Sequence, residues 1–396
     1  MYVLLKKKQE KQQKRERSKV ARKRISRGRL ETPSEVLSRI NEVFGEGTVV
    51  LGKDVTPTYF CPTGIPCLDV ALGGGIAENK FTEVFGEFSS GKSTFAYDFG
   101  TQWQGVHPSG IVFISDLERN FDKKYGKLRG LDLDRVIVHQ PSSGEDAGNA
   151  ISTFVDACPE GLIILDSVAA LISESFYEKD MSEREVAPIA RLCGAIIKKV
   201  HRATKSAPNA PGHTVLFLNQ TRTSIGVMWG DPNHSPGGQF KDFTCSQIIY
   251  LKRLKKDRKK KTVGGETVDE VDSYNIGFEV KKDKVSHGLG ARGELSFLLK
   301  DTSYLKAPGF DVAISALKQA RIAGLVKKSG ASLVYTVGSK TISGEKNILL
   351  HFASAKARRE LVAKILGERA ILVRTVGEKT VVKPPTVKAK IKPRLG

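Results

Sequence analysis

Short apolar runs alternate with segments that can form helices through the middle of the chain. The runs lie at residues 81–85, 111–114, 136–138, 162–165 and 214–218. Apolar residues at successive positions are typical of strands buried on both faces of a parallel sheet. The helical segments lie near residues 94–103, 145–157 and 187–203. This alternation predicts an α/β fold with a mainly parallel, twisted sheet.

The pattern changes on both sides of this region. Thr32, Pro33 and Glu35 form a capping-box sequence, which predicts a helix from residue 33 to Phe44 that ends at Gly45. Its small apolar face suggests packing on a larger body, such as a neighbouring subunit. Beyond the middle region, strands are expected at residues 246–251, 276–281 and 294–299.

The composition changes again after Phe310. A helix is expected to about Ala323, followed by short strands within 333–350 and a helix from Ser354 to Leu366. We therefore expect a small α+β domain at 306–370, after an α/β core at 66–305. The other expected parts are a basic disordered tail at 1–30, an N-terminal helix and linker for subunit packing at 31–65, and a basic tail at 371–396.

Residues 86–93, GEFSSGKS, match the phosphate-binding pattern G-x-x-x-x-G-K-[ST]. A strand before the loop and a helix after it are the context that a P-loop requires. The glycines let the backbone N–H groups point at a polyphosphate, and the helix N-terminus favours negative charge. Lys92 would reach the β and γ phosphates, and Ser93 would hold Mg²⁺. The alternative, a chance glycine-rich turn, does not account for this context.

Polar residues follow three of the buried strands. Glu118 comes after the strand at 111–114, where a carboxylate could act on a water beside the γ-phosphate. Asp166 ends the strand at 162–165, as a Walker B aspartate does, although many buried strands end in Asp. Asn219 and Gln220 end the strand at 214–218. They are candidate γ-phosphate sensors, unless they only satisfy local backbone groups.

Two stretches stand apart from this alternation. Residues 221–239 are long for a loop and contain Arg222, Ile225 and Trp229. Exposed apolar residues beside an arginine suit contacts with bases, whereas an ordered surface loop with a buried Trp229 is the alternative. The run at 252–261 is almost all Lys and Arg, which is usual for the solvated tip of a hairpin.

Most of the net charge of +21 lies at the two ends of the chain. Thirteen of the first thirty residues are Lys or Arg and two are Glu; of the last 23, seven are Lys or Arg and one is Glu. Such tails usually attract an anionic polymer, although they can simply aid solubility or, at the N-terminus, resemble a transit peptide. The five cysteines lack metal-site spacing and suit a reducing compartment. No apolar stretch is long enough to span a membrane.

With these residues in place, the chain resembles the RecA family of homologous-recombination ATPases, bacterial or phage-encoded. The resemblance runs from about residue 31 to 366. It rests on the P-loop, on 166–171 (DSVAAL) and on 219–222 (NQTR) with 225–228 (IGVM). It implies a RecA-like P-loop NTPase core that binds ATP and Mg²⁺ in a bacterial cytoplasm or a phage-infected host.

The resemblance also implies a role for each matching residue. Catalysis would use Glu118, Lys92 and Gln220, with Glu118 activating the attacking water. The nucleotide would be bound by Gly86, Ser89, Ser90, Gly91, Lys92, Ser93, Thr94, Asp122, Tyr125 and Asp166, and Mg²⁺ by Ser93 and Asp166. Asp122 and Tyr125 would hold the adenine. Lys282 and Lys284 would reach ATP bound by the neighbouring subunit, and Phe243 would relay the ATP state across that interface.

DNA would be bound by two loops, at 173–186 and 221–239. The implied contacts are Val186, Arg191, Arg222, Ile225, Gly237 and Gly238. Val186 and Ile225 would separate base triplets, and the two arginines would contact phosphates. The chain departs from the family pattern at its basic ends, since the family usually carries an acidic C-terminal tail. Thr223 and Ser224 suggest fewer phosphate contacts in the second loop.

The predicted function is therefore ATP-dependent pairing and exchange of homologous DNA strands by a DNA-dependent ATPase. The subunits would form a helical filament on single-stranded DNA and then engage double-stranded DNA, with no membrane partner. Single-strand-binding and mediator proteins are further candidate partners. Two alternatives remain: a ring-forming helicase on the same core, and a nucleic-acid-binding module with a vestigial ATP site. Intact Lys92, Ser93, Glu118 and Asp166 argue against the second alternative.

Overall fold

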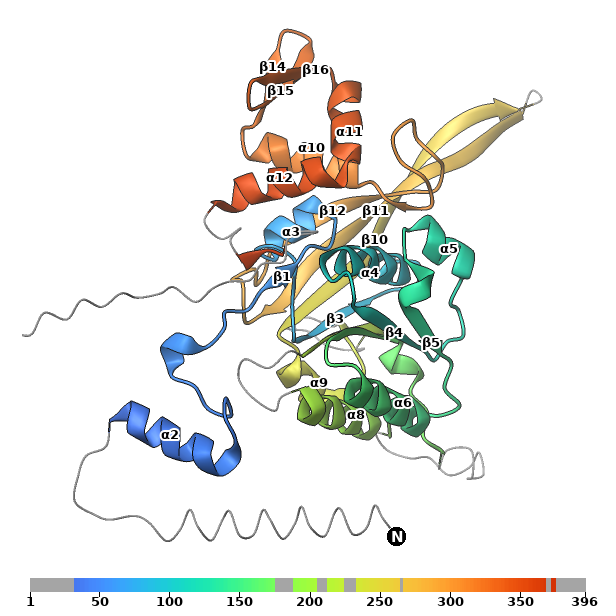
Figure 1. Ribbon diagram of the computed structural model, residues 1–396. Helices are drawn as coiled ribbons and strands as arrows, with labels where there is room; N and C mark the ends of the chain where they lie inside the picture. The colour runs from blue at the N-terminus through green and yellow to red at the C-terminus, as the bar shows by residue number, and fades with distance from the viewer. Residues whose placement is uncertain are drawn as a thin grey trace, which may run out of the picture.

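The fold is built on a nine-stranded mixed sheet (Figure 1). The computed structural model describes residues 32–174, 188–204, 212–223, 233–263, 266–367 and 372–374. The strands of the sheet are β3 (Phe81–Gly86), β4 (Ile111–Asp116), β5 (Val136–His139), β6 (Gly161–Asp166), β7 (His213–Gln220), β10 (Gln247–Val263), β11 (Glu266–Asp283), β12 (Arg292–Leu298) and β13 (Gly309–Phe310). Their order is β13-β12-β11-β10-β3-β7-β6-β4-β5.

Neighbouring strands run parallel from β10 through β3, β7, β6 and β4 to β5, and antiparallel from β10 to β13. The predicted α/β fold with a mainly parallel sheet is therefore confirmed. In a parallel sheet the carboxyl ends of the strands lie along one edge. Gly86 of β3 pairs with Gln220 of β7, and Asp116 of β4 pairs with Asp166 of β6, so the ends of these four strands meet there.

Helices cover both faces of the sheet. On one face, α4 (Lys92–Val106) buries Phe95, Phe99 and Trp103 against alternate residues of the central strands. On the other face, α6 (Gly144–Ala157) and α8 (Pro188–Thr204) pack on the remaining residues of the same strands. Because successive side chains of a strand point to opposite faces, an apolar run supplies both cores at once.

The shorter elements lie around this sheet. They are α2 (Pro33–Phe44), β1 (Phe60–Cys61), α3 (Pro66–Ala71), β2 (Ile76–Ala77), α5 (Lys123–Leu128), β8 (Arg222–Thr223), β9 (Asn233–His234) and α9 (Gly238–Thr244), with 3₁₀ turns at Gly52–Asp54, Leu133–Arg135 and Val168–Ala170. The predicted capping box of α2 is present, since Thr32 and Glu35 bond each other's backbone N–H groups. Val36 and Phe44 on this helix are 41% and 63% exposed, and the helix stands away from the sheet (Figure 1).

A second apolar cluster forms beyond the sheet, among α10 (Val312–Ile322), β14 (Val326–Ser329), β15 (Ser332–Val337), β16 (Lys340–Ser343), α11 (Glu345–Ala353) and α12 (Ala355–Leu366). Short strands were expected within 333–350, and β15 and β16 lie there, but the end of this range is helical because α11 begins at Glu345. Gly344, with a φ of 89°, ends the strand pairing, and Ile348, Leu349 and Phe352 bury one face of the helix.

Strands β10 and β11 also extend further than the sequence suggested. They remain paired through Val263 and Glu266 and project beyond the sheet as a two-stranded ribbon (Figure 1). The register continues to the end of the ribbon, where Thr262 pairs with Thr267 and Val263 with Glu266.

A short segment near the C-terminus returns to the start of the core. The Arg374 backbone N–H donates to the Phe60 carbonyl oxygen at 2.8 Å, and the guanidinium lies 4.3 Å from the Tyr59 ring centroid. Arg374 also pairs with Glu78 at 3.1 Å. Glu78 in turn contacts His107, whose other ring nitrogen contacts Glu160.

None of the helices in the described ranges is both long and apolar enough to cross a membrane.

Candidate nucleotide site

The P-loop joins β3 to α4 at the carboxyl edge of the sheet. Gly86 is confined, because a Cβ there would lie 2.2 Å from the Leu251 carbonyl oxygen and 2.6 Å from Ser90 Oγ. Gly91 has a φ of 83°, which favours glycine. The Lys92 ammonium donates to the Gly86 and Glu87 carbonyl oxygens at 3.0 and 2.8 Å. Burial lowers the pKa of Lys92, although the carboxylates of Asp166, Glu118 and Glu87 oppose this. The loop thus holds a cation over a curled backbone, which suits a polyphosphate.

Glu118 lies across the site from the P-loop. Its Oε1 accepts a hydrogen bond from Ser167 Oγ at 2.6 Å and another from Gln220 Nε2 at 3.1 Å. The strand ends of β4, β6 and β7 therefore converge on one carboxylate. A carboxylate oriented in this way can accept a proton from a water, and the amide can sense what occupies the space beside it.

Asp116 fixes the turn that carries Glu118. This carboxylate is buried and accepts hydrogen bonds from the Asn120 and Phe121 backbone N–H groups at 3.1 and 2.9 Å. The side-chain amide of Gln140, which directly follows β5, donates to the same carboxylate at 3.0 Å. Because a buried carboxylate needs such partners, these bonds hold the turn in one conformation.

Ser93 and Asp166 supply adjacent oxygen atoms. Ser93 Oγ donates to Asp166 Oδ2 at 3.2 Å. Burial, with the charges of Glu118 and Asp116, raises the pKa of Asp166 to about 6 despite the hydrogen bond from Ser93. A hydroxyl and a carboxylate beside a phosphate-binding loop are the ligands that Mg²⁺ takes in such sites, so the residues fit this ion.

These groups line a cavity of about 390 Å³. The cavity brings together most of the residues expected to bind the nucleotide or to catalyse its hydrolysis. They are Ser89, Ser90, Gly91, Lys92, Ser93, Thr94, Glu118, Tyr125, Asp166 and Gln220. The Tyr125 hydroxyl is 2.6 Å from Thr94 Oγ1, which fixes the ring at one wall. Asp122 does not line the cavity; its carboxylate caps α5 by accepting from the Lys124 and Tyr125 backbone N–H groups.

Four lining residues were not expected from the sequence: Phe88, Tyr274, Phe297 and Pro308. Tyr274 donates its hydroxyl proton to the Ser89 carbonyl oxygen at 3.2 Å and stacks on Phe297. Phe88 is 79% exposed at the cavity. Of these four residues, only Phe88 had a sequence signal that could have placed it at the site, because it lies inside the P-loop pattern. Tyr274 and Phe297 reach the cavity through the antiparallel strands β11 and β12.

Lys282 and Lys284 lie outside this cavity. Lys282 donates to the backbone carbonyls of Asp242 and Phe243, and Lys284 donates to that of Phe243 at 2.9 Å. Phe243 itself is 69% exposed. Both lysines, at the end of β11, therefore contact the C-terminal end of α9 of their own chain.

The residues expected to contact DNA are only partly described. Arg191 is exposed on α8, and Arg222 is exposed on β8, directly after the strand that carries Gln220. Gly237 and Gly238 begin α9 with positive φ values of 115° and 78°. Val186 and Ile225 lie outside the described residues, as do most of 173–186, residues 224–232 and nearly all of both basic tails.

The model of the RecA N-terminal domain matches residues 32–289. The chain belongs to the RecA family. Its RecA-like core therefore contains β3 to β11 and every lining residue of the cavity except Phe297 and Pro308.

Individual RecA proteins are similar over part or most of this chain. "Protein RecA" of Rhodopirellula baltica is 38% identical over 55% of this chain and 57% of its own length. That of Tropheryma whipplei is 31% identical over 76% of this chain and 64% of its own length. That of Mycobacteroides abscessus is 33% identical over 78% of this chain and 84% of its own length. The chain thus spans less than two thirds of the first two relatives. A RadB recombinase crystal structure aligns with a TM-score of 0.40 and 19% identity, covering 60% of this chain and 95% of that one.

Proposed function

We propose that this protein is an ATP-dependent DNA recombinase. It forms a filament on single-stranded DNA and pairs and exchanges homologous strands with a duplex while it hydrolyses ATP. Membership of the RecA family and the relatives' name support this proposal. The observation that carries it is the hydrogen bond between Gln220 and Glu118, because Gln220 is followed directly by the segment expected to bind DNA.

In this proposal the nucleotide binds in the cavity beside the P-loop. Lys92 leaves the Gly86 and Glu87 carbonyls to contact the phosphates. Tyr125, in the wall of the cavity, holds the adenine, and Asp122 acts indirectly by capping the helix that carries Tyr125. Mg²⁺, held by Ser93 and Asp166, would neutralise charge on the phosphate oxygens. Glu118 accepts the proton of the attacking water, oriented by Ser167 and Gln220.

Binding of the γ-phosphate gives the Gln220 amide a second acceptor besides Glu118. Any shift of Gln220 reaches Arg222 through two backbone positions, so ATP binding and DNA binding are coupled. Lys282 and Lys284, beside the C-terminal end of α9, would reach ATP bound by the next subunit, and the exposed Phe243 would relay the ATP state across that interface. Such a head-to-tail contact repeats without closing and produces a helical filament.

Base pairing, not side-chain contacts, would select the homologous sequence. Arg191 and Arg222 would contact the DNA backbone.

The test is ATP hydrolysis with and without single-stranded DNA, together with strand exchange on homologous substrates. We expect DNA to stimulate hydrolysis and exchange to require ATP. Glu118→Gln should lower turnover by about 10²-fold or more, as for loss of a general base, and leave ATP-dependent DNA binding intact. Glu345→Gln, on the exposed first turn of α11, is the control. Unwinding of forked duplex without exchange would replace this proposal by a helicase.

A further inference from the structure

A fully buried ion pair lies beside the nucleotide site but outside its cavity. Lys241 of α9 and Glu83 of β3 both have side chains that are 0% exposed. The Lys241 ammonium donates to Glu83 Oε2 at 2.5 Å, to Asp242 Oδ1 at 2.6 Å and to Ser235 Oγ at 3.0 Å. All three of its donors are therefore used. A buried charge is costly unless it is satisfied in this way, so the geometry around it is tightly specified.

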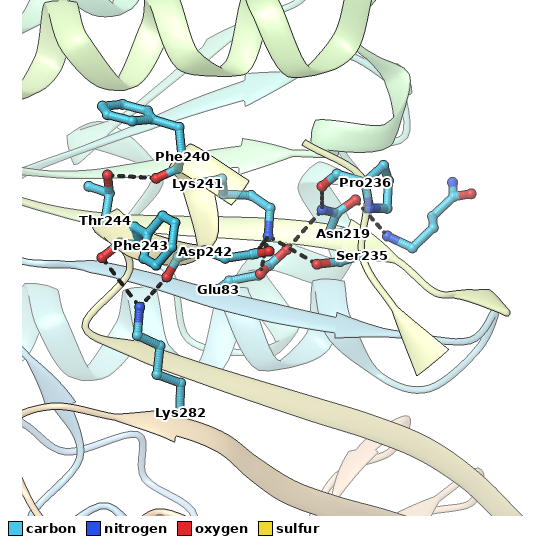
Figure 2. A network of polar contacts seen from close by, with 11 residues as sticks. Glu83, Asn219, Ser235, Pro236, Phe240, Lys241, Asp242, Phe243, Thr244 and Lys282 are labelled. Carbon is cyan, nitrogen blue, oxygen red and sulfur yellow. Dashed lines mark hydrogen bonds and ion pairs between the residues drawn. The ribbon is translucent and has the colours of Figure 1, made fainter. Parts of the chain in front are cut away.

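On one side of this pair, Figure 2 shows Glu83 between Lys241 and Asn219, the residue before Gln220 of the nucleotide site. Glu83 lies three residues before Gly86, and its other oxygen accepts a hydrogen bond from Asn219 Nδ2 at 2.8 Å. Asn219 also donates to the Pro236 carbonyl oxygen at 2.7 Å and accepts from the Gln220 backbone N–H at 3.0 Å. The ion pair thus fixes Asn219, and Asn219 fixes the backbone of the residue that contacts Glu118.

The other side leads to the outer face of α9. Lys241 lies between Phe240 and Phe243, which are 44% and 69% exposed. Asp242 contacts the Lys241 ammonium through its carboxylate, and its backbone carbonyl accepts from Lys282 (Figure 2). One short helix therefore carries a buried anchor and two exposed aromatic side chains, and it lies beside Lys282 of β11.

The start of α9 is shaped to admit the lysine. Gly237 has a φ of 115°, and a Cβ at this position would lie 2.9 Å from both Cδ and Cε of Lys241. It would also lie 3.1 Å from Val168 Cγ1. The absence of a side chain at residue 237 therefore makes room for the stem of Lys241, which crosses from α9 to β3.

We propose that Lys241 is a positioning residue that couples the nucleotide sensor to the subunit-facing surface. The Lys241–Glu83 pair joins β3, Asn219, the Ser235–Pro236 segment and α9 into one unit. A change at Gln220 on ATP binding is then transmitted to Phe243 and Lys282. The inference rests on the proposed function, because it requires ATP to act across a subunit contact. An apolar pair of the same volume would fill the space but would lack the directional bonds.

The test compares the wild-type chain with Lys241→Met, Glu83→Gln/Lys241→Met and a surface control, Lys327→Met on β14. Lys241→Met alone leaves Glu83 buried without its cation, so its Tm should fall. The double variant removes both charges and keeps the volume, so its Tm should recover. Even so, its stimulation by single-stranded DNA should fall about tenfold, within the 5–150-fold range typical of coupling between sites. A site shared between subunits should make hydrolysis by the wild-type chain depend sigmoidally on ATP, and this cooperativity should weaken in the double variant. The Kd for a fluorescent ATP analogue, measured without DNA, should stay within about twofold of wild type.

The outcomes separate the two proposals. A double variant with wild-type stability, stimulation and ATP dependence would show that the pair only fills space, and the inference would be wrong. If the wild-type chain itself lacks DNA stimulation, the proposed function fails and the inference fails with it. If the double variant does not fold, Glu83→Gln replaces it, because this change keeps the shape and leaves Lys241 its bonds to Asp242 and Ser235. Unchanged stimulation in Glu83→Gln would equally overturn the inference.

Discussion

Replacing His107 by Gln should change how the stability of the core depends on pH. The imidazole lies between two carboxylates, with Nε2 3.1 Å from Glu78 Oε1 and Nδ1 3.1 Å from Glu160 Oε1. Its side chain is only 9% exposed. Burial lowers the pKa of His107, but the hydrogen bonds and charges of Glu160 and Glu78 outweigh it and raise the pKa to about 9.

The magnitude follows from the difference between the folded and unfolded pKa values. The unfolded value is 6.5 and the folded value is about 9, and one pKa unit corresponds to 1.36 kcal/mol. Protonation of His107 therefore contributes about 3 kcal/mol to the free energy of unfolding. Because the folded pKa is the higher one, this contribution is fully present below pH 6.5 and is lost as the pH rises through 9.

Urea denaturation at a series of pH values between 6 and 10 measures this effect. The free energy of unfolding of the wild-type chain should fall with rising pH by about 3 kcal/mol more than that of His107→Gln. His351→Gln is the control, since the His351 ring contacts Tyr335 and Phe352 in the second apolar cluster. Parallel pH curves for the wild-type chain and His107→Gln would refute the argument that the two carboxylates hold the proton on His107.

Two further predictions concern the nucleotide site. Gly86→Ala places a methyl group 2.2 Å from the Leu251 carbonyl oxygen, so the P-loop must shift and affinity for a fluorescent ATP analogue should fall about tenfold or more. Gly52→Ala, where a Cβ has open space, should bind the analogue normally; equal affinities would mean that the loop tolerates the shift. Lys282→Ala should lose DNA-stimulated hydrolysis and regain part of it when mixed with Glu118→Gln, because each variant supplies the group that the other lacks. Mixtures that only average the two activities would count against a site shared between subunits.

Local patterns were sufficient for much of the fold. The apolar runs predicted the central parallel strands, since a strand between two layers of helices must be apolar at successive positions. The capping box predicted the start of α2, because its two hydrogen bonds involve residues three positions apart. Strands were expected within 333–350, but the end of this range is helical, since a short apolar segment fits a helix or a strand and only Gly344 and the packing of Phe352 decide.

Part of the nucleotide site could also be predicted from local sequence patterns. Glu118, Asp166 and Gln220 each follow a buried strand, so strand order alone brings them to one edge. Tyr274 and Phe297 were not predictable in this way. They reach the cavity only because β11 and β12 pair antiparallel to the parallel core, an arrangement without a local sequence signal.

The sequence by itself determined where the phosphates of a nucleotide would bind, because that chemistry lies in eight consecutive residues and in strand ends that a parallel sheet aligns. The tertiary structure alone decided which charged groups are buried together. Lys241 meets Glu83 across 158 positions, and Arg374 meets Glu78 across 296. Pairing of this kind depends on how α9 and the C-terminal segment pack against β3 and β1. From the sequence alone a charged residue is expected to be exposed to solvent, and only the packing around it shows whether it has a buried partner.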